Sequence, residues 1–148
     1  MLRAVQEAAK SMGVEVRDSP CQNDQDIETA IVALPKGGGG GLLVLGDIFT
    51  QVHRDTITRL ALTHRIPTVV NTRQLVESGG LIAYEVNAPD LFRRAAAYVD
   101  LILKGKRPVD LPVQAPTKFD LLVNLKTAKE LGVTLPNELI ATADDLIQ

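Results

Sequence analysis

Hydrophobic side chains recur along this chain in two ways, as stripes with helical spacing and as short continuous apolar runs. The first stripe lies in residues 2–12, and its spacing is that of one helix face: Leu2, Val5, Ala9 and Met12. Gly13 is expected to end this helix. Val14-Glu15-Val16 alternates apolar and charged side chains, which predicts a strand. A second stripe over Asp24 to Leu34 predicts another helix.

Continuous apolar runs follow, separated by further helical patterns. Runs of this kind are typical of strands buried on both faces, as in parallel sheets; they are Leu42 to Leu45, Pro67 to Val70 and Leu81 to Tyr84. Between them, Asp47 to Gln51 is expected to be a loop, and helices are predicted over His53 to His64 and Thr72 to Ser78. Strands that alternate with helices predict a three-layer, doubly wound α/β fold with a mainly parallel sheet.

The last third of the chain has a different pattern. Asp90 to Lys104 predicts the longest helix, with a broad apolar face formed by Leu91, Phe92, Ala95, Ala96, Val99, Ile102 and Leu103. Three prolines in Arg107 to Thr117 predict an extended connector. Lys118 to Val123 is expected to be the last strand, Asn124 to Leu131 a helix, and Pro136 to Gln148 a terminal helix.

Composition excludes several functions. A length of 148 residues suits one domain, and a net charge of −2 with both signs dispersed argues against nucleic-acid binding. The apolar runs are too short to span a membrane. The N-terminus lacks the pattern of a signal peptide, which predicts a cytoplasmic location if Met1 is the true start. Cys21 is the only cysteine, so an internal disulfide is excluded.

Motifs for catalysis and for cofactor binding are absent. The glycine run from Gly37 to Gly41 precedes a strand and lacks a following Gly-Lys-Ser/Thr, so we expect a flexible loop rather than a phosphate site. His53 and His64 have no Cys or carboxylate at metal-ligand spacing. No serine lies in a Gly-x-Ser-x-Gly motif. We therefore expect a protein that is not an enzyme and that holds no cofactor and no metal.

Polar and aromatic residues follow the predicted strands at one edge of the sheet, where open α/β sheets bind ligands. The candidate ligand-binding residues are Asp47, Phe49, Thr50, Asn71, Tyr84 and Glu85, and Gln51 lies among them. Asp47 suits a ligand ammonium group and Phe49 an apolar group. The alternative is that Asp47 or Thr50 caps the following helix, and for Asn71-Thr72 the alternative to a ligand contact is that Thr72 caps a later helix. Glu85 is alternatively a solvated loop charge.

Several stretches together resemble one family, the substrate-binding proteins of ABC transporters known as the ABC-sub-bind group. The resemblance covers the whole chain and is most specific in its later part; its main stretches are Gly41 to Thr50, Ala61 to Pro67, Glu77 to Tyr84, Asp90 to Asp100, Asp110 to Phe119 and Val123 to Lys129. Family members have the periplasmic-binding type I fold, with two lobes around a ligand cleft, and are about twice as long as this chain.

The resemblance implies that this chain is the C-terminal half of such a protein. Residues 1–83 and 117–148 then form the second lobe, and residues 84–116 cross to the first lobe and return. It also implies an amino-acid-like solute, an ABC permease as partner and a periplasmic location. The chain departs from the family at Glu85, where a glycine usually follows the tyrosine, and in its five-glycine run, which replaces a shorter and more polar stretch.

A single lobe supplies only half of the ligand contacts, so we expect weak or absent binding by this chain alone. The apolar face of the helix over residues 90–104 requires a partner. We therefore expect a homo-oligomer. A dimeric ligand-sensing or structural module, built from a single lobe and unrelated to transport, is the alternative function.

Overall fold

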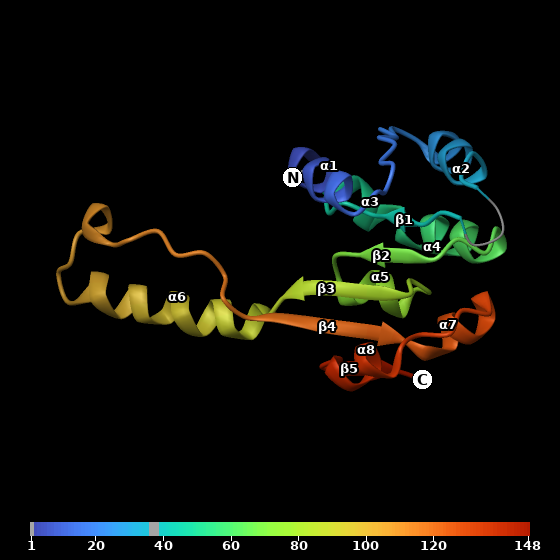
Figure 1. Ribbon diagram of the computed structural model, residues 1–148. Helices are drawn as coiled ribbons and strands as arrows, with labels where there is room; N and C mark the ends of the chain where they lie inside the picture. Colours follow the sequence, from blue (N-terminus) through green and yellow to red (C-terminus); the bar gives the residue numbers. More distant parts are fainter. Residues whose placement is uncertain (1, 36–38) are drawn as a thin grey trace.

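The core of the protein is a five-stranded sheet, seen in a computed structural model that describes residues 2–35 and 39–148 (Figure 1). The strands lie side by side in chain order: β1 (Leu42–Leu43), β2 (Thr68–Val70), β3 (Ile82–Val86), β4 (Phe119–Asn124) and β5 (Asp145–Ile147). Neighbouring strands are parallel except for β3 and β4, which are antiparallel. The predicted α/β fold with a mainly parallel sheet is therefore confirmed.

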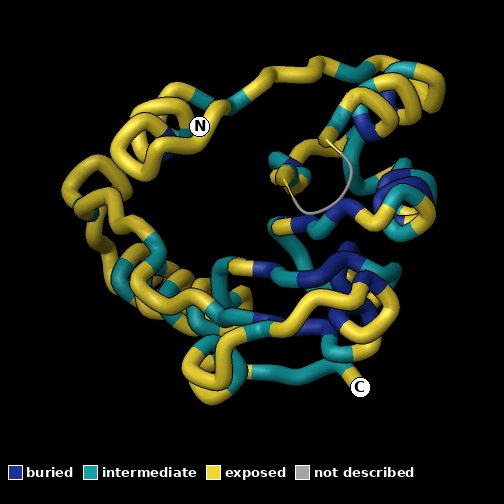
Figure 2. Tube along the Cα trace, turned by 45° about the vertical axis from the view of Figure 1, so that its right-hand side comes forward, coloured by how far each residue is buried: buried dark blue, intermediate teal, exposed yellow. Residues whose placement is uncertain are grey.

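One face of this sheet is covered by helices. Three of them, α2 (Asp24–Val32), α4 (Arg54–Thr63) and α5 (Arg73–Glu77), pack on the face that carries Val44 and Val70. The buried side chains of this core are Ile27, Ile31, Val44, Ile57, Leu60, Ala61, Ile66, Val70, Leu75, Val76, Ala83 and Leu122. Most are the apolar residues of the predicted stripes and runs, because burial of branched aliphatic side chains drives both kinds of element together. Figure 2 shows these buried segments gathered around β2, β3 and the helices beside them.

The opposite face of the sheet is partly open near β1. Leu43, Val69 and Ile82 are register partners there, and Leu43 is 45% and Val69 42% exposed. The prediction that these apolar strands are buried on both faces is therefore wrong for β1 and β2. The reason is that α2, α4 and α5 all lie on the other side.

The N-terminal segment agrees only in part with its prediction. The first helix is present as α1 (Leu2–Ser11), and Gly13 ends it with a φ of +67°, a conformation that suits glycine. Val14-Glu15-Val16 forms no strand: it has no regular secondary structure and lies outside the sheet. That prediction was wrong because alternation of apolar and polar residues indicates which side chains would share one face of a strand. It does not indicate whether another strand is present to pair with it. The glycine run includes Gly37 and Gly38, which lie outside the described residues.

Two further predictions need correction. Residues 47–51 are not a loop, because Ile48–Val52 form the short helix α3. The predicted terminal helix over Pro136 to Gln148 is interrupted: α7 (Leu125–Leu131) is followed by α8 (Asn137–Thr142), and then by strand β5. Asp144 makes two hydrogen bonds to the backbone of Leu121, each 2.8 Å long. The Asp144 amide donates to the Leu121 carbonyl, and the Leu121 amide donates to Asp144 Oδ2. This pairing with β4 draws the end of the chain into the sheet.

The longest helix, α6 (Ala88–Leu103), extends away from the sheet, and the segment after it runs back along the helix (Figure 1). No residue of α6 is buried. Its Arg94 donates to Thr117 Oγ1 at 3.0 Å and to Gln114 Oε1 at 2.6 Å, and the Tyr98 hydroxyl donates to the carbonyl of Pro112. The expected connector contains a short 3₁₀ turn, Pro108–Asp110. Among the described residues, no helix is both long and apolar enough to span a membrane.

Candidate functional site

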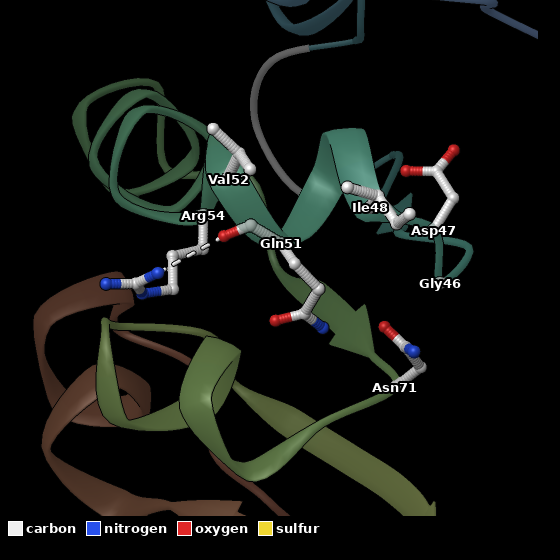
Figure 3. A pocket seen from close by; sticks show the side chains of 7 residues that line it. All are labelled: Gly46, Asp47, Ile48, Gln51, Val52, Arg54 and Asn71. Carbon is white, nitrogen blue, oxygen red and sulfur yellow. Dashed lines mark hydrogen bonds between the residues drawn. The ribbon is translucent and has the colours of Figure 1, made fainter.

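An open hollow lies at the carboxyl ends of β1 and β2 (Figure 3). Its volume is about 520 Å³, within the range of pockets that hold small molecules. It is lined by Gly46, Asp47, Ile48, Gln51, Val52, Arg54 and Asn71. Asp47 and Asn71, which belong to separate strand ends, therefore meet at one site. This is the edge of the sheet where the order of residues along the chain predicts a ligand.

Asp47 and Thr50 form a capping box that starts α3. The Thr50 amide donates to Asp47 Oδ1 at 2.7 Å, and the Asp47 amide donates to Thr50 Oγ1 at 3.1 Å. The Thr50 hydroxyl also donates to the carbonyl of Leu45, at 3.1 Å. The capping interpretation of both residues is confirmed. Asp47 is exposed and lines the hollow as well, whereas the Thr50 hydroxyl is engaged by the backbone around it.

Asn71 is the most unusual polar group of the hollow. Its Oδ1 atom is buried and accepts no hydrogen bond from the residues that the structure describes. Its amide lies against Gly46, where a Cβ atom would come within 1.9 Å of Asn71 Nδ2. Glycine at position 46 thus leaves the space that the Asn71 side chain occupies. A buried acceptor without a donor costs about 1–3 kcal/mol, so the site has an unused hydrogen-bonding capacity.

A hydrogen bond connects the lining residue Gln51 to the residue before α5. Gln51 Nε2 donates to Thr72 Oγ1 at 3.0 Å, which joins α3 to the residue before α5. Thr72 does precede the helix, yet its side chain does not cap it. The cap is supplied instead by Glu85 on β3, whose Oε2 accepts from the Arg73 amide at 2.8 Å. The half-buried Glu85 carboxylate therefore holds the loop that carries Asn71.

An ion pair fixes the same helix start from the other side. Arg73 Nη1 lies 2.7 Å from Asp145 Oδ2 on β5 and 3.8 Å from Glu77 Oε1. The hydrogen bond from Arg73 lowers the pKa of the Asp145 carboxyl group, and the same bond raises the pKa of the Arg73 guanidinium group. Both side chains are partly solvated, so this pair orients α5 more than it stabilises the fold.

The aromatic candidates lie outside the lining of the hollow. The Phe49 ring stacks on His53, with centroids 4.1 Å apart, and packs on the hydrophobic core. Tyr84 is exposed on β3 and stacks on Phe119 of β4, with centroids 5.2 Å apart and planes 11° apart. Glu85 is likewise not among the lining residues. Of the six candidates, the structure brings Asp47 and Asn71 together at the hollow and places Thr50 in the cap beneath Asp47.

Sequence reasoning missed the apolar and basic part of the lining. Ile48 and Val52 are strongly exposed, and with Gln51 they share one face of α3. Arg54 follows them and donates to the Gln51 carbonyl at 3.2 Å. The spacing of Ile48, Gln51 and Val52 is the available signal, but it is visible only once residues 48–52 are taken as a helix.

The arrangement suits binding more than bond-making chemistry. It offers a free amide acceptor, an exposed carboxylate and an apolar patch in an open hollow. Within residues 2–35 and 39–148, no three His, Cys, Asp or Glu side chains gather in a way that would hold a metal ion. The carboxyl edge of a mainly parallel α/β sheet, where this hollow lies, is the place at which open α/β proteins bind small molecules.

The particular family is given by the sequence pattern. The chain belongs to the ABC transporter substrate binding protein family, which it matches over residues 1–147. This is a family of binding proteins. A curated relative, an uncharacterized protein of Rickettsia prowazekii (strain Madrid E), is 26% identical over 119 residues, which are 80% of this chain and 39% of that protein.

Solved structures share the fold. A conserved domain protein from Vibrio cholerae matches with a TM-score of 0.83 and 23% identity, over 98% of this chain and 49% of that one. An ABC domain in complex with L-Trp from Streptococcus pneumoniae matches with a TM-score of 0.85 and 21% identity, over 99% and 50%. The ligand-free, open structure of a substrate binding protein with adhesive properties from Clostridium difficile matches with a TM-score of 0.75 and 22% identity, over 99% and 49%. The chain spans about half the length of these structures.

Proposed function

We propose that this chain is one lobe of the solute receptor of an ABC-type uptake system, and that the hollow at the ends of β1 and β2 is its half of the ligand site. The observation that carries the proposal is the buried Asn71 Oδ1 atom, which has no donor among the described residues at the edge where this fold binds ligands. A ligand N–H group that pairs with this atom would remove the cost of leaving it unpaired.

The chemistry of the hollow favours an amino-acid-like solute. The exposed Asp47 carboxylate suits an ammonium group, Asn71 suits a further N–H donor, and Ile48 and Val52 offer apolar contact. The neighbour from Streptococcus pneumoniae was solved in complex with L-Trp, which agrees with this class. Phe49, Thr50, Tyr84 and Glu85 are also proposed as wall residues, of which Tyr84 is exposed, whereas Thr50 and Glu85 hold the starts of α3 and α5 and Phe49 packs on the core. The receptor would act in the periplasm and deliver the solute to a permease.

The exposure of α6 supports the proposed division of the chain. Residues 1–83 and 117–148 form the lobe, and residues 84–116 cross to a second lobe and return. α6 lies in this crossover and exposes large apolar side chains, with Phe92 at 76% and Leu103 at 81%. Contact with a second lobe would bury them, and fully burying each such side chain contributes about 1.5–3 kcal/mol.

Chemical-shift mapping with a panel of free amino acids, L-tryptophan included, tests the site. We expect a Kd in the millimolar range, about −4 kcal/mol, because half of the contacts are missing. The shifts should centre on the amides of Asp47, Gln51 and Asn71. Asn71→Ala should abolish them, whereas the matched Asn137→Ala change on the exposed start of α8 should not. Chemical-shift changes confined to another surface would refute the position of the site. Submicromolar binding would refute the proposal that this chain supplies only half of the ligand contacts.

A second candidate is a dimeric ligand-sensing or structural module, favoured by the same exposed side chains of α6. Light scattering distinguishes it: the dimer predicts a doubled mass that Phe92→Ser abolishes. The control is Val113→Ser, on the exposed segment that runs back along α6. A monomer at high concentration would eliminate this candidate.

A further inference from the structure

Two acidic side chains lie opposite each other where β3 leads into α6 and β4 returns (Figure 1). Glu85 on β3 is the register partner of Asp120 on β4, in the antiparallel pair, and both residues are half-buried. Partners of this kind project from the same face of a sheet, with their Cβ atoms about 4.5–5.5 Å apart. Like charges at this spacing repel each other, so each carboxylate is best placed against a donor that lies away from the other.

The donors to these two carboxylates belong to different helix starts. Glu85 Oε2 accepts from the Arg73 amide at the start of α5, at 2.8 Å. Both oxygens of Asp120 accept from Asn87 Nδ2, at 2.9 and 2.7 Å. Asn87 in turn caps α6, because its Oδ1 atom accepts from the Asp90 amide at 2.9 Å. One set of bonds therefore joins the start of α6 to β4, and another joins β3 to the start of α5.

The Asn87 side chain lies on the same face as both carboxylates. Side chains two positions apart on an extended backbone share a face, and Asn87 follows Glu85 by two positions. Its bonds to Asp120, the register partner of Glu85, agree with this placement. An asparagine amide has two N–H donors, and here both oxygens of Asp120 accept from it. Glu85 is thereby left to the Arg73 amide.

The bond from Arg73 to Glu85 bears directly on the candidate ligand site. Asn71 and Thr72 link β2 to α5, and side chains from two other elements hold this link. Gln51 donates to Thr72 Oγ1 from the α3 side, and Glu85 accepts the Arg73 amide from the β3 side. Because Asn71 Oδ1 is buried at this link, a displacement of the link changes how that atom faces the hollow.

We propose that Glu85 is a positioning residue for Asn71, and that Asp120 preserves this role by engaging the Asn87 amide. Without Asp120, the Asn87 amide binds Glu85 and draws it away from α5. The start of α6 is thereby connected with the ligand site, since Asn87 also caps α6. Glu85 contributes to the wall of the site through Asn71. The effect on ligand binding rests on the proposed function, whereas the arrangement of hydrogen bonds does not.

Amide hydrogen exchange and titration of the full chain with L-tryptophan test the role of Glu85. Glu85→Ala should speed exchange of the Arg73 amide at least about tenfold and raise the Kd for L-tryptophan several-fold, because the link loses one of its two holds. Glu85→Gln keeps an acceptor oxygen, so it should restore most of both properties. The Leu81 amide, bonded to Thr68 Oγ1 at 2.9 Å, reports on the rest of the sheet and should not change.

A pair of variants tests the competition for the Asn87 amide. Asp120→Ala frees this amide to bind Glu85, so exchange of the Arg73 amide should become at least about threefold faster. Adding Asn87→Ala removes the competing donor, and the double variant should regain the slow exchange of the unchanged chain. The matched control for loss of a carboxylate is Glu130→Ala on the exposed surface of α7, which should alter neither exchange nor L-tryptophan binding.

Other outcomes overturn the proposal. Unchanged exchange of the Arg73 amide in Glu85→Ala, or an equal acceleration at Leu81, would show that Glu85 does not position α5 specifically. A double variant that exchanges as fast as Asp120→Ala would exclude Asn87 as the competitor. Fast exchange at Arg73 with an unaltered Kd would separate Glu85 from the site. Failure of the unchanged chain to bind L-tryptophan would count against the proposed function instead, and the exchange rates would still decide the hydrogen-bond arrangement.

Discussion

The replacement Thr68→Val removes one buried oxygen from the strand that leads to the candidate site. Thr68 lies on β2 and is 2% exposed, and its Oγ1 atom accepts the Leu81 amide at 2.9 Å. This bond ties β2, which ends just before Asn71, to the residue that precedes β3. Valine has nearly the same shape but no acceptor.

The magnitude follows from what the replacement leaves behind. Leu81 is buried, so its amide loses an acceptor where water cannot replace it. An unpaired buried donor costs about 1–3 kcal/mol of unfolding free energy. For a chain of this size, each kcal/mol lowers the melting temperature by about 2–4 °C. Thr68→Ser keeps the oxygen and should restore the bond, at the smaller cost of a lost methyl group, about 1 kcal/mol.

Thr58 is the matched control, because it is 1% exposed but uses its hydroxyl differently. Its Oγ1 donates to the Arg54 carbonyl at 2.9 Å, within α4. A helix carbonyl keeps its backbone partner when such a hydroxyl is lost, so Thr58→Val should change stability by less than about 0.5 kcal/mol. Urea unfolding followed by circular dichroism measures both, since the chain has no tryptophan. Equal effects at the two positions would refute the reasoning.

Three further predictions concern the helix ends and the site. Gly132→Ala should cost about 1–2 kcal/mol in urea unfolding, because Gly132 has a φ of +71° and no atom within 4 Å of a new Cβ; an unchanged midpoint would contradict this. Gly46→Ala should displace the Asn71 amide and abolish the amino-acid shifts at this edge with the circular dichroism spectrum retained; unaltered shifts would count against the site. The lowered pKa of Asp145 contributes stability above the pKa of the unfolded chain, about 3.9, and this contribution is lost as pH falls through the lower folded pKa. Asp145→Asn should therefore reduce the fall in unfolding free energy that the unchanged chain shows below about pH 4. Identical dependence of the unfolding free energy on pH in the two proteins would exclude a role for the bond to Arg73.

Helices were the most predictable elements of the fold. α1, α2, α4 and α6 all lie within a residue or two of their predicted bounds, because a long amphipathic stripe with a glycine, asparagine or aspartate at its end leaves few alternatives. Asn23 before α2 and Asn87 before α6 accept the helix amides as such caps do. Strands β1, β2 and β3 were found from their apolar runs and β4 was expected over Lys118 to Val123, whereas β5 was predicted to be part of a terminal helix.

The candidate site was predictable only to the level of the sheet edge. Asp47 and Asn71 follow two parallel strands, and this alone predicts that they meet. The short helix α3 could not be inferred, because five residues are too few to establish a period. Because this helix was not predicted, Ile48 and Val52 were not recognised as residues that line the hollow. Whether Phe49 faces the hollow or the core depends on His53, on which its ring stacks.

Taken by itself, the sequence determined the α/β class, most of the helices and the edge at which the candidate residues Asp47 and Asn71 meet, since these depend on patterns within a few residues of one another. Tertiary structure alone decided the rest. Glu85 caps α5 from another strand, Asp144 draws the chain end into the sheet, and Val14–Val16 stays outside it. Each of these outcomes depends on which backbone groups lie opposite one another across the sheet, and spacing along a single chain does not contain that information.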